Sequence, residues 1–268
     1  STQRVNGATG PQLLAVFGFG DAAPSGHADP RYLQVALPAQ GDAPFECWMV
    51  AGEVRSGREA GIAWSANDGL QFGAIEIADA GDAAIETAAA DAYARLQAWL
   101  AGSGYPHALR IWNYMDAITD GEGDDERYRR FCVGRARGIG RDLAAGELPA
   151  ATAIGSSDGQ RRLQVYWLAS SEPGTPVENP RQVSAWRYPR QYGPQSPSFA
   201  RAMLPPAGAA MPLLLSGTAA VVGHASQHSD SVAAQLDETL ANLDSLVGAA
   251  RGLDPSLPPA FGAGSALK

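Results

Sequence analysis

A strand–helix–strand order that occurs twice is the feature that most limits what this chain can fold into. In the first half, a helical pattern at 81–104 follows an apolar strand pattern and leads into HALRIWNYM (107–115), a second predicted strand. In the second half, a helical pattern at 230–252 follows another apolar strand pattern and leads into SALK (265–268). Helices are predicted here from apolar residues at helical spacing, and strands from apolar runs bounded by turn residues.

Two β-α-β halves predict an α+β fold with mixed sheets and helices packed on one face. Prolines at 173, 176 and 180 mark a linker, so we predict an N-terminal lobe at 1–170 and a C-terminal lobe at 171–268. The second lobe is expected to lack its last strands, because the chain ends where its second strand would begin.

Local signals refine this outline. Two runs between residues 45 and 79 predict a hairpin with its turn at Asn67-Asp68-Gly69. Gly102 is the predicted C-cap of the first helix, and Asp230 the N-cap of the last. A further helix is predicted at 123–143, with Asp124 and Asp125 at its positive end. Further strands are predicted at 13–20, 32–38, 151–156, 163–170 and, as a buried strand with small central residues, 211–224.

Composition excludes several classes of protein. Apolar residues make up 45% of the 268 residues and charged residues 18%, which is enough for a core and unlike a disordered chain. The net charge of −8 argues against nucleic-acid binding. No apolar run suggests a membrane span or signal peptide, so a cytoplasmic protein is expected. Cys47 and Cys132 lack metal-ligand spacing and are predicted to be buried free thiols.

Lysine is almost absent, which excludes further chemistry. Lys268 is the only lysine, so the other 19 of the 20 basic residues are arginines. Schiff-base aldolases, pyridoxal enzymes and P-loop nucleotidases all need an internal lysine. Arginine must therefore supply the positive charges. Its planar guanidinium group binds carboxylates well but is a poor nucleophile or base.

The basic residues concentrate in one segment, ENPRQVSAWRYPRQYGPQSPSFARA (178–202). After Glu178 no acidic residue occurs until Asp230. The segment contains Arg181, Arg187, Arg190 and Arg201, together with Tyr188 and Tyr192. An arginine cluster without neighbouring acids predicts a site for an anionic ligand, although its arginines could also pair with distant acids or coat a polar surface.

This segment, IWNYMDAITDGEGDDERYRRFCVGRARGI (111–139) and SGTAAVVGHASQHSD (216–230) together resemble the chorismatases. These are also called pteridine-dependent-deoxygenase-like proteins, and they include the 3-hydroxybenzoate synthases of xanthomonad pigment pathways. The resemblance covers nearly all of the chain. It implies lobes similar to RidA/YjgF proteins and cleavage of chorismate to pyruvate and a hydroxybenzoate, either 3- or 4-hydroxybenzoate, without a metal or cofactor.

Chorismate is a dianion with two carboxylates, which fits the arginine segment. Read as a strand, VSAWRYP places Ser184, Trp186 and Tyr188 on one face and Arg187 on the other, at the surface. We therefore expect the substrate-binding residues to be Arg181, Tyr188, Arg190, Tyr192, Gly217, Thr218 and Ala220. Tyrosine and threonine hydroxyls would donate hydrogen bonds, and the small residues would let a ligand approach the backbone. Ala220 is the residue that the resemblance implies for shaping the pocket, and small residues for helix packing are the alternative.

The chemistry requires a general acid that protonates the enolpyruvyl methylene carbon. The resemblance implies that this acid is a glutamate in a C-terminal segment, beyond Lys268, so no catalytic residue is assigned here. We therefore expect residues 1–268 to bind chorismate weakly and to release pyruvate slowly. Glu238 is predicted to lie on a solvated helix face and is the first residue to test if the chain is active.

Two other functions stay open. One is a RidA-like imine or enamine deaminase, and the other is a non-catalytic protein that binds aromatic acids. His224 and His228 are predicted to lie in a loop before the last helix, not in a metal site. The sequence leaves the oligomeric state, monomer or homo-oligomer, undecided.

Overall fold

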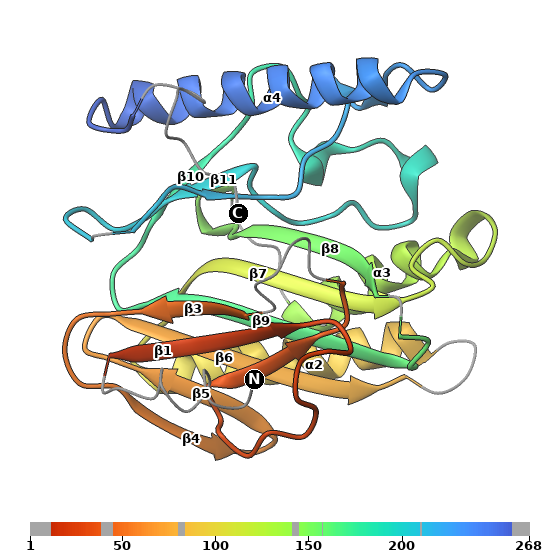
Figure 1. Cartoon of the computed structure of the whole chain (residues 1–268). Coiled ribbons are helices and arrows are strands. Elements are labelled where there is room, and N and C mark those ends of the chain that lie inside the picture. The colour runs from red at the N-terminus through yellow and green to blue at the C-terminus, as the bar shows by residue number, and fades with distance from the viewer. Residues whose placement is uncertain are drawn as a thin grey trace. The chain divides into compact units, whose positions relative to one another are not determined.

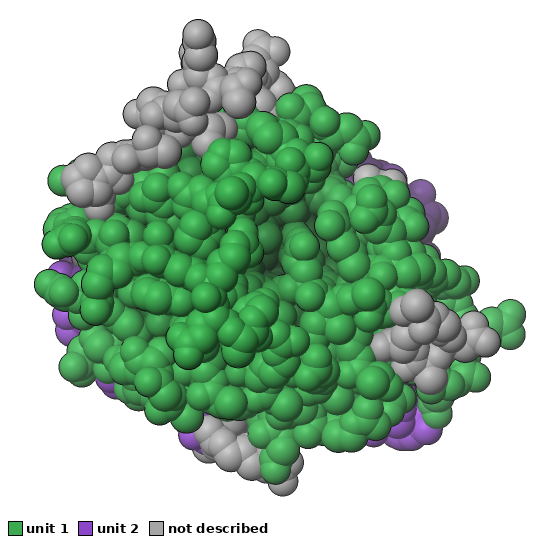
Figure 2. All heavy atoms as spheres, turned by 90° about the horizontal axis from the view of Figure 1, so that it is seen from below, with its two compact units in different colours: residues 1–142, 153–172 green, residues 143–152, 173–268 purple. Residues whose placement is uncertain are grey.

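The computed structural model describes residues 12–38, 45–79, 84–140, 145–156, 158–209 and 211–258. The chain divides into two compact units (Figure 2). Unit 1 contains residues 1–142 and 153–172, and unit 2 contains residues 143–152 and 173–268. The division after residue 172 lies beside the linker expected from sequence, and residues 143–152 group with the later part of the chain.

A six-stranded sheet in the order β4-β5-β6-β9-β7-β8 contains most of the strands of unit 1, and residues 150–152 at the start of β8 belong to unit 2. The strands of this sheet are β4 (Arg55–Glu59), β5 (Ile62–Ala66), β6 (Leu70–Ala78), β7 (His107–Asp116), β8 (Ala150–Ser156) and β9 (Arg162–Ser170). A three-stranded sheet, β2-β1-β3, is formed by β1 (Leu13–Phe19), β2 (Tyr32–Val35) and β3 (Phe45–Met49). β2 is parallel to β1 and β3 is antiparallel, so this sheet is mixed.

Two helices cover one face of the large sheet and the small sheet covers the other (Figure 1). The helices are α2 (Ala84–Ser103) and α3 (Arg127–Ile139), with a 3₁₀ turn, η1 (Gly123–Asp125), before α3. On the helix face, Tyr93 of α2 donates a hydrogen bond of 2.8 Å to Asn113 of β7. On the opposite face, the Ser65 hydroxyl donates to the Leu14 carbonyl. The α+β class and the packing of helices on one face are thus confirmed for unit 1.

Glycine and tryptophan alternate across four strands on the helix face. Gly57 of β4 faces Trp64 of β5, which faces Gly73 of β6, which faces Trp167 of β9. A Cβ atom on Gly73 would lie 2.2 Å from the Trp167 ring, and one on Gly57 would lie 3.1 Å from the Trp64 ring. The Trp167 ring therefore lies over Gly73 at a position where only glycine leaves room, and the Trp64 ring packs closely over Gly57.

The two helices of unit 1 are also in glycine-mediated contact. A Cβ on Gly134 of α3 would lie 2.0 Å from the Glu86 carbonyl oxygen of α2, and one on Gly138 would lie 2.3 Å from that of Ala90. Helices pack about 8–10 Å apart with ordinary side chains, and small residues permit closer approach. The GRARG run thus brings the α3 backbone against α2.

A buried ion-pair network ties the start of α3 to the ends of β6 and β7. An Arg127 guanidinium nitrogen lies 2.6 Å from Asp79 Oδ2 and 3.1 Å from Asp116 Oδ1. Arg127 Nε also donates to the Asp116 carbonyl, at 3.2 Å. Arg161 adds a second cation, because its Nε lies 3.5 Å from Asp116 Oδ2. Both carboxylates are therefore compensated although they are buried.

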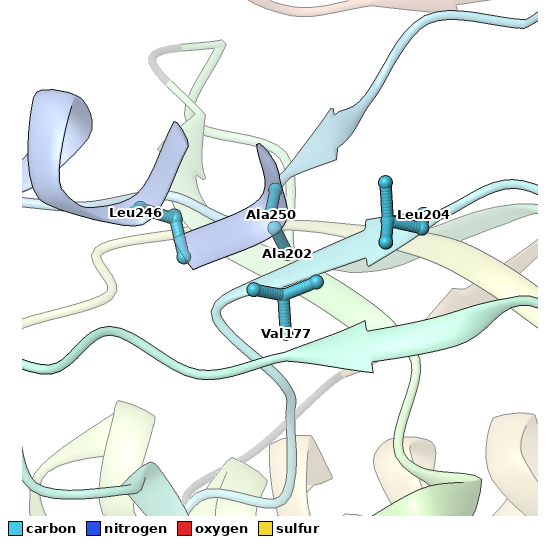
Figure 3. Packing of buried hydrophobic residues seen from close by; sticks show 5 residues of the cluster. All are labelled: Val177, Ala202, Leu204, Leu246 and Ala250. Carbon is cyan, nitrogen blue, oxygen red and sulfur yellow. The ribbon is translucent and has the colours of Figure 1, made fainter. Parts of the chain in front are cut away.

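The described residues of unit 2 form short strands and one long helix, α4 (Val232–Leu253). Its strands are β10 (Thr175–Val177), β11 (Ala202–Leu204), β12 (Leu214–Leu215), β13 (Val221–Val222) and β14 (Ala225–Ser226). β10, β11 and β12 form one antiparallel sheet, and β13 and β14 form a hairpin. Val177, Ala202 and Leu204 pack with Leu246 and Ala250 of α4, which makes the core of this unit (Figure 3).

Some local predictions are confirmed and others are wrong. The β5–β6 turn forms at Asn67, whose side-chain oxygen accepts the Leu70 N–H at 2.8 Å. β3 does not belong to that hairpin, because it pairs with β1. The first helix continues past Gly102 and ends before Gly104, which has φ +82°. The N-cap of α4 is Ser231, not Asp230, since the Ser231 hydroxyl accepts the Ala234 N–H.

The predicted buried strand at 211–224 is also wrong, because only Leu214–Leu215 and Val221–Val222 are strands there. Cys132 is buried, as expected, whereas Cys47 is exposed. SALK and any strand after it lie outside the described residues. None of the described helices is long and apolar enough to cross a membrane.

Candidate functional site

The arginine segment folds as consecutive turns. Two 3₁₀ turns, η3 (Ala185–Arg187) and η4 (Arg190–Tyr192), occupy its centre, and the Tyr188 N–H donates to the Ala185 carbonyl at 3.1 Å. The predicted strand alternation around Tyr188 is therefore wrong. Prolines at 180, 189, 194 and 197 lack the N–H that a strand ladder needs, which explains the preference for turns. Arg187 is exposed, as expected.

Arg181 has an acidic partner that lies 57 residues away in sequence. Its guanidinium donates to Glu238 Oε1 of α4, and His228 Nε2 lies 3.1 Å from Glu238 Oε2. The hydrogen bond from His228 and the charge of Arg181 lower the pKa of Glu238 below its ordinary value. Glu238 is thus an ionised partner of two basic side chains and does not lie on a purely solvated face.

The two tyrosines lie side by side, with ring centroids 5.3 Å apart. The Tyr188 hydroxyl accepts a hydrogen bond of 2.9 Å from the Arg201 guanidinium. The Tyr192 hydroxyl donates to the His224 carbonyl at 2.7 Å and lies 3.1 Å from His224 Nδ1. Arg201 was not among the expected binding residues, yet it is the arginine that contacts Tyr188.

The small-residue segment 217–220 is connected to the arginine segment. The Gln182 side chain lies 3.4 Å from Thr218 Oγ1 and donates to the Val221 carbonyl at 3.2 Å. The Gly217 N–H donates to Thr152 Oγ1 at 2.9 Å, and Ala220 is buried. Backbone hydrogen bonds of 2.8 Å join Val183 and Arg181 to Gly223.

Asn242 is a buried residue of this region that sequence reasoning missed. Its amide nitrogen donates to the carbonyls of Ala219 and Val221, both at 2.9 Å, and its own carbonyl accepts from Asn179 at 2.8 Å. An amide in the apolar pattern of α4 was the available signal, because buried polar groups are retained where they find partners. Asn242 therefore fixes both segments to α4.

The structure thus brings together some of the expected residues, all within unit 2. Tyr188 and Tyr192 are adjacent, and Thr218 and Ala220 lie in the segment hydrogen-bonded to the arginine turns. Arg181 is directed to Glu238, and Arg190 is exposed. Within the described part of the chain, no three His, Cys, Asp or Glu side chains are placed to share a metal ion.

A second aromatic and basic group lies in unit 1, and its residues were not among those expected from sequence to form a site. Arg110, Trp112 and Tyr114 alternate along β7; the Arg110 guanidinium lies 4.7 Å from the Trp112 ring centre, and burial lowers the pKa of Arg110 to about 10. Tyr166 of β9 stacks on Trp112 and Tyr114 at 4.9 and 5.8 Å. On the other face of the sheet, a pocket between β4, β5 and α2 is lined by Trp64, Trp99 and Tyr105, among others, and by none of the expected site residues.

Known proteins resemble this chain over most of its length. Residues 46–169 match the model of the family described as "Chorismatase FkbO/Hyg5-like, N-terminal". A "Chorismatase" of Streptomyces rapamycinicus is 36% identical over 76% of this chain and 61% of its own length. A "3-hydroxybenzoate synthase" of Streptomyces hygroscopicus is 33% identical over 91% of this chain and 74% of its own length. A chorismatase crystal structure superposes with a TM-score of 0.75 at 29% identity, covering 89% of this chain and 73% of that one.

These similarities cover both units, and they include relatives more than 30% identical of which this chain spans over two thirds. The chain belongs to the chorismatase family. It spans about three fifths of the first of these relatives.

Proposed function

We propose that this protein is a chorismatase, which converts chorismate to pyruvate and a hydroxybenzoate, 3-hydroxybenzoate in the first instance. The observation that carries the proposal is the contact, within unit 2, between two segments that both resemble the chorismatases. The arginine turns and segment 217–224 are far apart in sequence, and Gln182 and Tyr192 hydrogen-bond them together. Because the chain belongs to the chorismatase family, the substrate proposed for these arginines and tyrosines is chorismate, whose two carboxylates carry the opposite charge.

The proposed binding residues are those expected from sequence: Arg181, Tyr188, Arg190, Tyr192, Gly217, Thr218 and Ala220. Guanidinium and phenol groups would hold the two carboxylates by charge-assisted hydrogen bonds. Proton transfer to the methylene carbon makes an oxocarbenium ion, water adds to it, and the hemiketal releases pyruvate. Loss of water from the ring then gives the aromatic acid, so atoms balance without a cofactor. Guanidinium is too weak an acid for the protonation step, which needs a carboxylic acid.

The test is incubation with chorismate. Pyruvate would be followed with lactate dehydrogenase and the aromatic product by chromatography, while calorimetry would measure chorismate binding to the 268-residue chain. Arg190→Ala should weaken chorismate binding by about tenfold or more, as for a lost charge-assisted pair. Exposed Arg187→Ala, in the neighbouring turn, is the matched control and should leave binding nearly unchanged.

Each result has a clear meaning. Pyruvate and hydroxybenzoate formed together would support the proposal, and a mass balance of one to one is expected. Chorismate binding without even the slow release of pyruvate expected of this chain would favour a binding protein. Neither binding nor turnover would overturn the proposal.

A further inference from the structure

A cavity of 370 Å³ lies on the helix face of the large sheet, between β4, β5 and α2. All of its lining residues belong to unit 1, and none of them belongs to the proposed chorismate site. Its volume lies within the range of about 300–1,000 Å³ that is usual for small-molecule sites. The cavity is lined by Arg55, Glu59, Trp64, Gln71, Trp99 and Gly102, among others.

Two tryptophans form the apolar wall of this cavity. Trp64 of β5 and Trp99 of α2 are both half-buried, and their ring centroids lie 6.2 Å apart with the ring planes tilted by 41°. The Trp64 ring packs closely over Gly57 of β4, because a Cβ atom added there would lie 3.1 Å from it. Half-buried indoles beside a cavity offer a flat apolar surface, which favours contact with another aromatic ring.

Gln71 of β6 is a buried polar residue of the lining, with only 2% of the residue exposed. Its Oε1 accepts the Trp99 Nε1–H at 2.8 Å. Because an indole nitrogen can only donate, this bond fixes which end of the amide is oxygen. Gln71 Nε2 makes no hydrogen bond to any described residue, although buried amides normally have partners. The atom is not completely enclosed, so its N–H groups are available to a ligand in the cavity.

The rim of the cavity carries one charge of each sign. Arg55 and Glu59 lie on β4 on either side of Gly57, and both are exposed. Since Gly57 pairs with Trp64, strand alternation places Arg55 and Glu59 on the face that carries the Trp64 ring. An anion attracted by Arg55 is repelled by Glu59, and a cation meets the reverse. The rim therefore gives no net preference for a charged ligand.

We propose that this cavity binds an uncharged aromatic molecule that carries a carbonyl group. The aromatic ring would lie against Trp64 and Trp99, and the carbonyl oxygen would accept a hydrogen bond from Gln71 Nε2. This bond satisfies a donor that the described residues leave without a partner, so it favours a carbonyl compound over a hydrocarbon of the same size. The proposal does not rest on the chorismatase function, because chorismate is a dianion and its proposed site lies in unit 2.

Three probes of similar size separate the contribution of the carbonyl group from that of charge. Acetophenone has a ring and a carbonyl, ethylbenzene has a ring alone, and benzoate has a ring and a negative charge. Each would be titrated into the isotope-labelled chain of 268 residues and followed by nuclear magnetic resonance. Acetophenone should bind at least about fivefold more tightly than either other probe, as expected for one net hydrogen bond. It should also shift the side-chain N–H signals of Gln71, Trp64 and Trp99.

Gly102→Leu tests whether this cavity is the binding site. Gly102 lies in α2 and lines the cavity, and nothing lies within 4 Å of a Cβ atom added there. The leucine side chain should therefore occupy the cavity without disturbing the fold, and it should weaken acetophenone binding at least about tenfold. Gly248→Leu makes the same change at an equally open position of α4, so it is the matched control and should leave binding unchanged.

Gln71→Met tests the hydrogen bond. Methionine keeps the length of the side chain but has no amide donor, so acetophenone should lose most of its advantage over ethylbenzene. Circular dichroism and thermal melting would establish that each variant is folded. If Gln71→Met does not fold, Gly102→Leu and the preference of the wild-type chain for acetophenone carry the test.

Acetophenone binding that is tighter than ethylbenzene binding and is lost in Gly102→Leu would support the proposal. Equal affinities for acetophenone and ethylbenzene in the wild-type chain would overturn it, and so would tighter binding of benzoate. Acetophenone binding that survives in folded Gly102→Leu would place the ligand elsewhere and overturn it as well. Pyruvate release from chorismate, measured separately, tests the proposed function and has no bearing on these results.

Discussion

Arg127 of unit 1 and Arg201 of unit 2 are equally buried, each with 6% of the residue exposed, yet their surroundings differ. Arg127 contacts the carboxylates of Asp79 and Asp116. Arg201 contacts a hydroxyl, a carbonyl and two aromatic rings. Arg127 has two carboxylates in direct contact with its guanidinium, whereas the Arg201 guanidinium donates to neutral groups and Arg201 meets Glu178 through its backbone N–H. Equal burial therefore does not mean equal electrostatic surroundings.

The largest expected effect is on the free energy of unfolding, and it comes from removing Arg127 from its ion-pair network. Arg127→Met would leave the Asp79 and Asp116 carboxylates buried, with Arg161 as the remaining cation of the network among the described residues. The free energy of unfolding should fall by about 3–5 kcal/mol, measured by urea denaturation. Arg161→Met, which removes a half-exposed partner of the same network, should cost less than about 1 kcal/mol. A loss below 1 kcal/mol in Arg127→Met would show that the network is not what holds α3 to the sheet.

The next effect tests how tightly each unit is packed. Gly134→Ala places a methyl group against the Glu86 carbonyl and should cost about 1–3 kcal/mol of unfolding free energy. Gly248→Ala in α4 is the matched change, because nothing lies within 4 Å of the added Cβ. It should stabilise the protein by about 0.5–1 kcal/mol through helix propensity. Thermal melting of the two variants should therefore shift in opposite directions, and equal shifts would contradict the packing described here.

A smaller effect is expected when the unpaired arginine is removed. Arg201→Met loses hydrogen bonds to Val183 and Tyr188 but no ion pair, so unfolding free energy should fall by about 1 kcal/mol. Denaturation in urea, alongside Arg127→Met, measures the difference directly. A loss as large as that of Arg127→Met would mean that Arg201 is a structural charge as well.

The smallest effect concerns pH. The pKa of Glu178 is raised above 4.5, so its stabilising contribution is complete below that value and is lost as pH rises through the raised pKa. Glu178→Gln should therefore gain stability relative to the wild type as pH rises above about 4.5. The pKa of Glu238 is lowered, mainly by His228 and Arg181, so its contribution is present above 4.5 and is lost as pH falls. Glu238→Gln should show the opposite slope in urea denaturation at several pH values, and parallel slopes would refute both assignments.

Sequence patterns predicted the elements that are set by local signals. The helix at 84–103 and strands such as 162–170 carry long apolar patterns, and the Asn67 turn carries its own hydrogen-bonding side chain. The turns between residues 181 and 192 were missed. The short alternating pattern there suggested a strand, but the prolines lack the backbone N–H that strand pairing needs.

The candidate site was predictable only in part. A segment rich in arginine and poor in acids was visible, and so was its resemblance to a family. The pairing of Arg181 with Glu238 depends on a contact across 57 residues, and no local pattern contains it. The hydrogen bond from the Arg201 backbone N–H to Glu178 depends on where one ladder ends, which the sequence of two three-residue strands does not determine.

The alternating glycines and tryptophans of the large sheet have a consequence for how the sheet assembles. If β4 slipped by two residues against β5, Arg55 or Glu59 would replace Gly57 beside the Trp64 ring. If β6 slipped by two residues against β9, Gln71 or Ile75 would meet the Trp167 ring where Gly73 now leaves space. Each such shift keeps the same faces buried, so the hydrophobic pattern alone would tolerate it. The glycine positions therefore help to fix the strand register during folding, because they leave room for the indole rings in one alignment of neighbouring strands and not in the nearest alternatives.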